Sequence, residues 1–276
     1  MSATAIAEKP GKVFIYRHTV LVRITHWINV IAITFLVMSG LQIFNAHPAL
    51  YWGKTSTFDH PILSMTAEDT DNGDQIGQTQ IFGWKFNTTG LFGLSNTAGE
   101  AEERGFPWWT TVPTYRDLAT GRRWHFFFAW VFAINGAIYL IANLINRHVW
   151  RDLLPSWEQL RNIGPTIWHH MKLKFPHERD YNVLQKLTYL IMIIGVLPLI
   201  ILAGLTMSPG MDAAFPWLLD LFGGRQTART IHFICATLIV LFVLVHVALV
   251  LVSGVWNNIR SMITGRYRID AEAPHG

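Results

Sequence analysis

Four histidines lie in stretches of the chain that otherwise carry no charged side chain. The chain has 276 residues and twelve histidines, and these four are His26, His125, His232 and His246. An ionisable residue inside an apolar segment is costly, so its presence there indicates a function. Imidazole ligates haem iron and other metals, and it can also relay protons. The four histidines therefore predict metal, cofactor or proton chemistry within apolar segments.

The segments that carry these histidines are long enough to cross a membrane. Hydrophobic residues make up 51% of the chain and charged residues only 14%, whereas an average soluble domain is about a quarter charged. A helix needs about 20 apolar residues to cross a bilayer. The uncharged windows of sufficient length are 24–44, 124–145, 187–207 and 231–256.

These windows predict an all-α integral membrane protein, a four-transmembrane-helix bundle that forms a single domain over residues 1–276. With flanking residues included, the predicted helices cover about 20–44, 123–146, 185–207 and 228–256. The first window is too long for a cleavable signal peptide and has no small-residue cleavage site after it.

The distribution of charge predicts the orientation of the helices. The N-terminal arm, residues 147–186 and the C-terminal tail together carry a net charge of +7, whereas the two opposite segments carry −3. Because positively charged loops stay in the cytoplasm, both termini are predicted to be cytoplasmic. The long segment 45–122 is then periplasmic and the connection 147–184 cytoplasmic. We call the periplasmic ends of the helices outer and the cytoplasmic ends inner. Membrane topology, rather than nucleic-acid binding, explains the basic excess.

This topology sorts the four histidines into two pairs by depth. His232 and His246 are fourteen residues apart, which on a helix is roughly 21 Å of rise and within about 40° of the same face. His125 begins the second helix at the outer level of His232, and His26 lies at the inner level of His246. The pairs His125/His232 and His26/His246 each predict the axial ligands of one haem b between helices, so two haems are expected.

The cysteine content excludes two other kinds of redox centre. The chain has one cysteine, so it cannot by itself hold an iron–sulfur cluster. It has no Cys-x-x-Cys-His sequence, so haem is not attached in the c-type manner. The histidines outside the apolar windows, including His169 and His170, are read as ordinary polar residues.

Two further sets of residues are candidates for cofactor or substrate contacts. Four arginines flank the predicted ligands, where they would either pair with haem propionates or serve as snorkelling and topology-setting charges; they are Arg23, Arg122, Arg123 and Arg229. The end of the fourth helix combines a flat apolar side chain with hydrogen-bonding groups, as a quinone site does; these residues are Ser253, Trp256, Asn257 and Asn258. The alternative for this second set is a polar end of an interfacial helix.

The periplasmic segment 45–122 is far longer than a usual connection between packed helices. Aromatic residues such as Trp108 and Trp109 punctuate a polar sequence, which predicts an ordered cap. Its acidic residues cluster at 68–74 and 100–103. They either make a solvated loop or dock a redox partner. On the other side, residues 156–175 predict an amphipathic interfacial helix.

Three sequences around the histidines resemble the cytochrome b561-like cytochrome b superfamily. They are Arg23-Ile24-Thr25-His26-Trp27, Arg122-Arg123-Trp124-His125 and the fourth-helix pair His232…His246. The superfamily includes the cytochrome b subunits of nickel–iron hydrogenases and the gamma subunit of formate dehydrogenase N. The resemblance implies that the first- and fourth-helix histidines hold the cytoplasmic-side haem and that the second- and fourth-helix histidines hold the outer haem.

The long outer segment departs from the hydrogenase type. The stretches at 39–48 and 205–211 look like a proteobacterial branch whose members accompany periplasmic molybdopterin oxidoreductases of the sulfite-oxidase type. The resemblance thus implies a multi-pass protein of the bacterial inner membrane with a periplasmic redox partner, in place of a hydrogenase or formate dehydrogenase.

The resulting prediction is a di-haem b electron carrier between a periplasmic redox protein and the membrane quinone pool. It would be an electron-transfer subunit rather than a self-contained enzyme. Two alternatives remain: a stand-alone transmembrane haem reductase, and a transporter that uses the histidines as a proton relay. The direction of electron flow and the oligomeric state, a homo-oligomer included, are left open by the sequence.

Overall fold

The computed structural model describes residues 12–97, 99–145 and 183–270, together with positions 154, 156, 157, 161 and 164. The predicted helix at 156–175 and most of the 147–184 connection lie outside the described residues. The chain divides into two compact units. Unit 1 comprises 1–27, 139–187 and 243–276, and unit 2 comprises 28–138 and 188–242.

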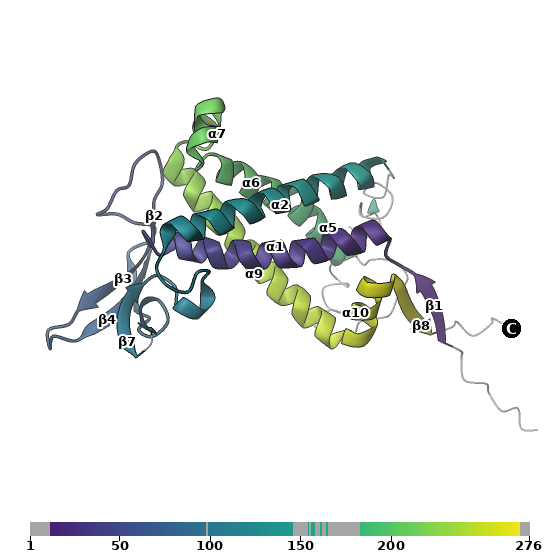
Figure 1. The fold of residues 1–276 in the computed structure, drawn as a ribbon, viewed down its shortest axis with the longest axis horizontal. Coiled ribbons are helices and arrows are strands. Elements are labelled where there is room, and N and C mark those ends of the chain that lie inside the picture. Colours follow the sequence, from purple (N-terminus) through teal and green to yellow (C-terminus); the bar gives the residue numbers. More distant parts are fainter. Residues whose placement is uncertain are drawn as a thin grey trace, which may run out of the picture. The chain divides into compact units, whose positions relative to one another are not determined.

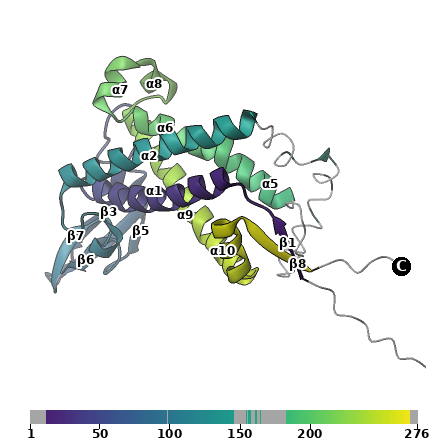
Figure 2. The same cartoon turned by 45° about the vertical axis from the view of Figure 1, so that its right-hand side comes forward.

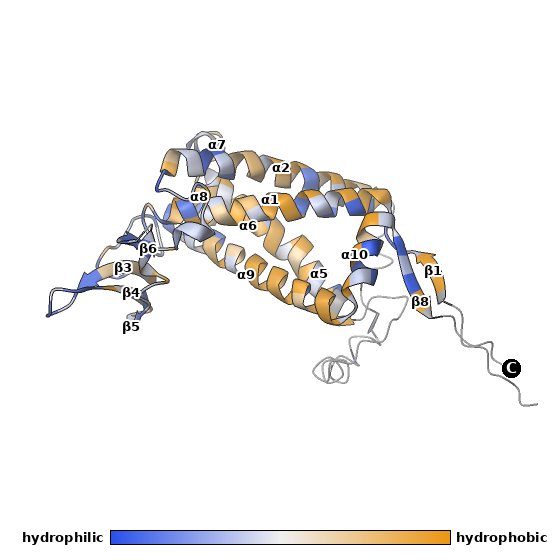
Figure 3. Ribbon diagram, turned by 60° about the horizontal axis from the view of Figure 1, so that its bottom comes forward, coloured by the Kyte–Doolittle hydropathy of each residue, from blue (hydrophilic) through white to orange (hydrophobic). Residues whose placement is uncertain are grey.

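Four helical segments of the described chain are long and apolar enough to cross a membrane, as predicted. They are α1 (Val20–Phe44), α2 (Leu118–Ile145), a composite segment (Lys186–Leu205) and α9 (Arg225–Val252). In Figure 3 these long helices carry the hydrophobic colour, whereas much of the segment between α1 and α2 is hydrophilic. Their exposed side chains are largely apolar, as lipid contact requires.

The third segment is not one regular helix. It consists of α5 (Val183–Leu190), a π-helical turn η3 (Ile191–Val196) and α6 (Leu197–Leu205). Pro198 is the second residue of α6 and has no N–H to donate to the carbonyl four residues earlier. The wider π-helical turn directly before it is one of the local adjustments by which a membrane helix re-satisfies the backbone groups that a proline frees.

The fourth helix ends earlier than the predicted residue 256. Gly254 lies just after the end of α9 and has φ +105°, a backbone conformation that residues other than glycine rarely adopt. The chain then turns into the short amphipathic helix α10 (Val255–Thr264). In unit 1, α10 leads into β8 (Arg266–Asp270), which pairs antiparallel with β1 (Lys12–Tyr16); Figure 2 shows this pair beside α10.

The prediction of an all-α protein is wrong in part, because the regular structure of the outer segment is mainly β-strand. Its four-stranded antiparallel sheet has the order β2-β3-β4-β5, and a separate hairpin joins β6 to β7. Figure 1 places these strands at the outer end of α1. The strands are β2 (Ala49–Leu50), β3 (Leu63–Asp69), β4 (Gln75–Ile81), β5 (Trp84–Asn87), β6 (Gly93–Thr97) and β7 (Glu100–Arg104). We call residues 45–117 the cap.

The cap is attached to the helices of unit 2 by an apolar cluster and by hydrogen bonds. Phe44, Leu50 and Met65 form a buried cluster against which Phe106 and Phe233 pack. A short 3₁₀ helix, η1 (Trp108–Thr110), precedes Asp117, which caps α2. The Asp117 carboxylate accepts hydrogen bonds from the Thr120 hydroxyl and backbone N–H, and these bonds lower the pKa of Asp117.

The outer start of α9 is also held by the cap. The Gly53 carbonyl accepts hydrogen bonds from the backbone N–H groups of Gln226 and Thr227, which have no partner within the helix. Two short helices, α7 (Pro209–Ala214) and α8 (Trp217–Leu221), connect α6 to this point. Further along α1 and α2 from the cap, a buried cluster joins the two helices; it consists of Ala32, Phe128 and Phe132.

Candidate functional site

The predicted outer pair of histidines comes together within unit 2. The ring centroids of His125 on α2 and His232 on α9 are 6.1 Å apart. His125 Nδ1 lies 3.2 Å from the Leu36 carbonyl oxygen, and His232 Nδ1 lies 2.9 Å from the Ile200 carbonyl oxygen. A carbonyl only accepts, so Nδ1 carries the proton in each ring. The Nε2 atom of each ring is then left with its lone pair, as a metal ligand requires.

The predicted inner pair comes together within unit 1. The ring centroids of His26 on α1 and His246 on α9 are 6.4 Å apart. His26 Nδ1 is buried and has no hydrogen-bond partner among the described residues. The outer histidines are thus held by backbone carbonyls, and His26 is not.

The centroid distances of both pairs would suit two imidazoles that hold one metal ion. With a metal–nitrogen distance of about 2.0 Å, the centroids of two such rings lie roughly 6 Å apart. The described residues contain no group of three or more His, Cys, Asp or Glu side chains that could hold a metal ion. A pair of imidazoles with no third protein donor suits an iron whose remaining ligands come from a porphyrin.

The four flanking arginines have different surroundings. Arg229 Nη2 donates to the His47 carbonyl oxygen at 2.5 Å, and its guanidinium lies 5.6 Å from the Phe44 ring centroid. Burial, with the nearby Arg229 charge as a second cause, lowers the pKa of His47. Arg23, in unit 1, donates to the Ile263 carbonyl oxygen, and its Nε is buried without a partner in the described chain.

Arg122 and Arg123 are exposed on α2, three and two residues before His125. The Arg122 guanidinium lies 5.5 Å from the Phe126 ring centroid. A contact with a residue of its own helix is typical of a snorkelling side chain. Arg229, in contrast, is partly buried and contacts the cap.

Comparison with known proteins places the chain in a family. Residues 17–265 match the family model described as prokaryotic cytochrome b561. The chain belongs to the prokaryotic cytochrome b561 family. It is also 30% identical over 235 residues, 84% of this chain and 89% of the relative, to a protein of Azospira oryzae named "Putative protein-methionine-sulfoxide reductase subunit YedZ1". No solved structure matches the chain.

Membership of the cytochrome b561 family makes the chain an integral membrane protein that binds haem b and transfers electrons. The resemblance read from the sequence is thereby confirmed. The spacing of the rings in the two histidine pairs also favours haem as the bound group. The number of haems and the ligand assignment stay predictions.

The residues predicted to contact quinone do not form one cluster of available polar groups in this cytochrome. Asn257 Nδ2 donates to the Arg268 carbonyl oxygen, and its Oδ1 accepts from the Arg268 N–H, so it holds β8. Asn258 Nδ2 donates to the Ser253 hydroxyl at 2.9 Å. Trp256 is 83% exposed on α10. The two amides stabilise the turn after α9, and Trp256 offers the apolar surface.

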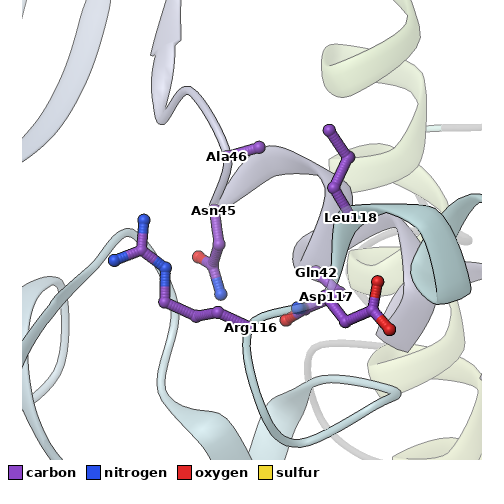
Figure 4. A pocket seen from close by; sticks show the side chains of 6 residues that line it. All are labelled: Gln42, Asn45, Ala46, Arg116, Asp117 and Leu118. Atoms are coloured by element: carbon purple, nitrogen blue, oxygen red, sulfur yellow. The ribbon is translucent and has the colours of Figure 1, made fainter.

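A small cavity lies where the cap meets the outer ends of α1 and α2. It has a volume of about 270 Å³. Figure 4 shows the side chains of Gln42, Asn45 and Arg116 around it, with Asp117 and Leu118 at the start of α2. Gln42 and Asn45 also donate to the carbonyl oxygens of Tyr115 and Phe106, so this cavity is framed by the joint between α1 and the cap.

The acidic clusters of the cap are only partly available to a partner. Glu102 pairs with the buried Arg104 at 3.2 Å, and Glu68 pairs with Lys85 at 3.2 Å. Glu103 accepts from the Ala67 N–H, whereas Glu100 is exposed at the β6–β7 turn. The exposed aromatic residues of the cap include Trp84 and Trp109.

Sequence reasoning missed the residues that surround the outer histidines. Ser39 is fully buried, and its hydroxyl lies 3.1 Å from His125 Nδ1. Gly40 and Gly204 each face one of the two rings. The adjacent Ser39 and Gly40 interrupt an otherwise apolar helix, and this interruption could have indicated that they have a role.

Proposed function

We propose that this cytochrome is a di-haem b subunit that transfers electrons between the membrane quinone pool and a periplasmic oxidoreductase. The observation that carries the proposal is the existence of two separate histidine pairs, with centroid distances of 6.1 Å and 6.4 Å. In the proposal, His125 and His232 hold the outer haem, and His26 and His246 hold the inner haem.

The proposed partner is a molybdopterin oxidoreductase of the sulfite-oxidase type. The sequence resemblance implies such a partner, and the name of the Azospira relative supports one that reduces methionine sulfoxide in proteins. Electrons would then flow from quinol to the inner haem, on to the outer haem and out to the partner. In the proposal the protein lies in the bacterial inner membrane, as the family resemblance implies, with both termini in the cytoplasm, which the positive-inside charge distribution supports.

The chain's own contribution is to hold and orient the cofactors. Haem b supplies one-electron redox chemistry when it is bound. The Leu36 and Ile200 carbonyls orient the outer ligands by accepting the Nδ1 protons. Arg229 lies three residues before His232 on α9, and we propose that it pairs with a propionate of the outer haem in addition to the His47 carbonyl oxygen. For the quinone, we propose the surface beside Trp256, with Asn257 and Asn258 framing it.

Two haems b per chain are expected, because there are two independent ligand pairs. A pyridine haemochrome assay on purified protein of known concentration measures this ratio. Quinol should then reduce both haems, and adding the purified partner with methionine sulfoxide should reoxidise them. One haem in fully loaded protein would refute the di-haem proposal. Efficient turnover of a small oxidant without the partner would instead favour the stand-alone reductase.

The topology gives a second test. Single cysteines at Thr70 and Glu100, in a Cys235→Ala background, are expected to react with a membrane-impermeant maleimide added to intact spheroplasts. A cysteine at His170 should react only after the membrane is opened. The opposite pattern would invert the assignment of outer and inner haems.

A third test concerns docking of the partner by the exposed acids. Glu100→Gln with Glu103→Gln should slow electron transfer to a basic partner at low salt, while both haem spectra stay unchanged. Electrostatic attraction acts mainly on the association rate. The effect should shrink as the Debye length falls from about 10 Å at 0.1 M to about 3 Å at 1 M salt.

Asp212→Asn with Asp220→Asn is the matched control, since it removes the same charge from α7 and α8 outside the cap. Glu102 is left in place because it pairs with the buried Arg104. Equal rates for the two double variants would assign docking to the exposed aromatic residues of the cap instead.

A further inference from the structure

The two outer histidines meet the same backbone pattern on two different helices. His125 donates to the carbonyl of Leu36 on α1, and Gly40 follows four residues later. His232 donates to the carbonyl of Ile200 on α6, and Gly204 follows four residues later. In an α-helix the carbonyl of one residue points toward the N–H of the residue four positions on. A ring that reaches such a carbonyl must therefore pass over the Cα atom of that later residue.

This geometry explains why both positions are glycine. A Cβ atom at Gly40 would lie 3.3 Å from His125 Cε1, and one at Gly204 would lie 3.2 Å from His232 Cε1. Both distances are tighter than ordinary van der Waals contact, so the ring would have to shift by a few tenths of an ångström. A shift of the ring would lengthen or misalign its hydrogen bond to the carbonyl and would displace its Nε2 atom.

The two sides differ at the residue before each glycine. Ser39 and Ala203 occupy equivalent positions, and both are fully buried. The Ser39 hydroxyl donates its single proton to the Phe35 carbonyl at 2.5 Å, which leaves an oxygen lone pair for His125 Nδ1 at 3.1 Å. The His125 N–H is thus shared by two acceptors, whereas Ala203 offers no side-chain acceptor to His232.

We propose that Gly40 and Gly204 are positioning residues that admit the two outer ligands, and that Ser39 is a positioning residue that polarises His125. The inference rests on the proposed role of His125 and His232 as haem ligands. A second acceptor on Nδ1–H makes the imidazole a more basic ligand. A more basic ligand favours ferric over ferrous iron, so Ser39 lowers the midpoint potential of the outer haem.

The Ser39→Ala variant tests the polarising role. Its outer haem is expected to have a higher midpoint potential than that of the parent in a spectroelectrochemical titration, with the inner haem unchanged. The control is Thr34→Val on the same helix, where the hydroxyl also donates to a carbonyl four residues earlier but the side chain is exposed. Unchanged potentials in Ser39→Ala would overturn the role of Ser39.

The Gly40→Ala and Gly204→Ala variants test the positioning role. Loss of the outer haem to apomyoglobin is expected to be about tenfold faster than in the parent, the lower end of what outer-shell changes cost. Gly136→Ala is the matched control, since it lies within α2 and a Cβ atom there meets nothing within 4 Å. Retention of the inner haem shows that the variants are folded. If both alanine variants keep the outer haem as long as Gly136→Ala does, the positioning role is wrong.

His125→Ala separates this inference from the proposed function. If His125→Ala keeps both haems, the ligand assignment itself fails. If His125→Ala loses the outer haem while the serine and glycine variants match their controls, only the positioning inference fails.

Discussion

His125→Ala and His232→Ala will each leave the cytochrome with one haem, and it will be the same haem in both variants. The ring centroids of the two histidines are 6.1 Å apart, and a haem b that loses one of two axial ligands is held weakly. His26→Ala and His246→Ala will both remove the other haem, because these rings form the second pair at 6.4 Å. Reduced-minus-oxidised spectra and a haemochrome assay on the four purified variants measure which haem is lost.

The variants must group as two pairs for the assignment to hold. His60→Ala is the control, since this histidine is exposed in the cap and should leave two haems. If His125→Ala grouped with His246→Ala, the depth argument would be wrong. Loss of both haems in every variant would mean that the bundle needs a full set of cofactors to fold, and low-temperature spectra of protein made with excess haem would then decide the grouping.

The pairing of the histidines was predictable because it depends only on helical geometry and depth. Uncharged windows fix where the membrane helices lie, and a residue's place in its window fixes its level. His125 is seven residues into α2 and His232 seven residues into α9, which brings them to one level when both helices begin on the same side. Neither step needs knowledge of side-chain packing.

The β-structure of the cap was not predictable in the same way. Its strands do not alternate cleanly between apolar and polar residues, because they form small sheets with little buried core. In β5 all four residues are exposed, including Trp84 and Phe86. Such strands are stabilised by pairing with distant parts of the chain, and a single sequence does not record those pairings.

The environment of the outer ligands was missed for a related reason. The acceptors of the two Nδ1 protons are backbone carbonyls, of Leu36 and Ile200, and every residue has a carbonyl. Only the glycine four residues later marks which carbonyl is used. The pairs Leu36 with Gly40 and Ile200 with Gly204 show this spacing of four residues. The structure was needed to reveal that the spacing carries this meaning.

Arg104→Ala is expected to weaken the joint between the cap and the outer end of α1 and to cost the protein about 3 kcal/mol of stability, because a buried group left without its hydrogen-bond partner costs about 1–3 kcal/mol. Arg104 is 1% exposed, and its guanidinium donates to Glu102, Thr111, Gln42 and the Thr114 carbonyl oxygen. Its loss leaves these acceptors without their donor, and the joint between the β6–β7 hairpin and α1 depends on them. Limited proteolysis should therefore cut the cap faster, and thermal loss of the outer-haem spectrum should begin at a lower temperature.

Arg116→Ala is the control. Arg116 is exposed and makes one long contact to the Glu103 carbonyl oxygen, so its replacement should cost no more than about 0.5 kcal/mol of stability. If the two variants were equally stable, the Phe44 cluster and the other hydrogen bonds between cap and helices would hold the cap without Arg104.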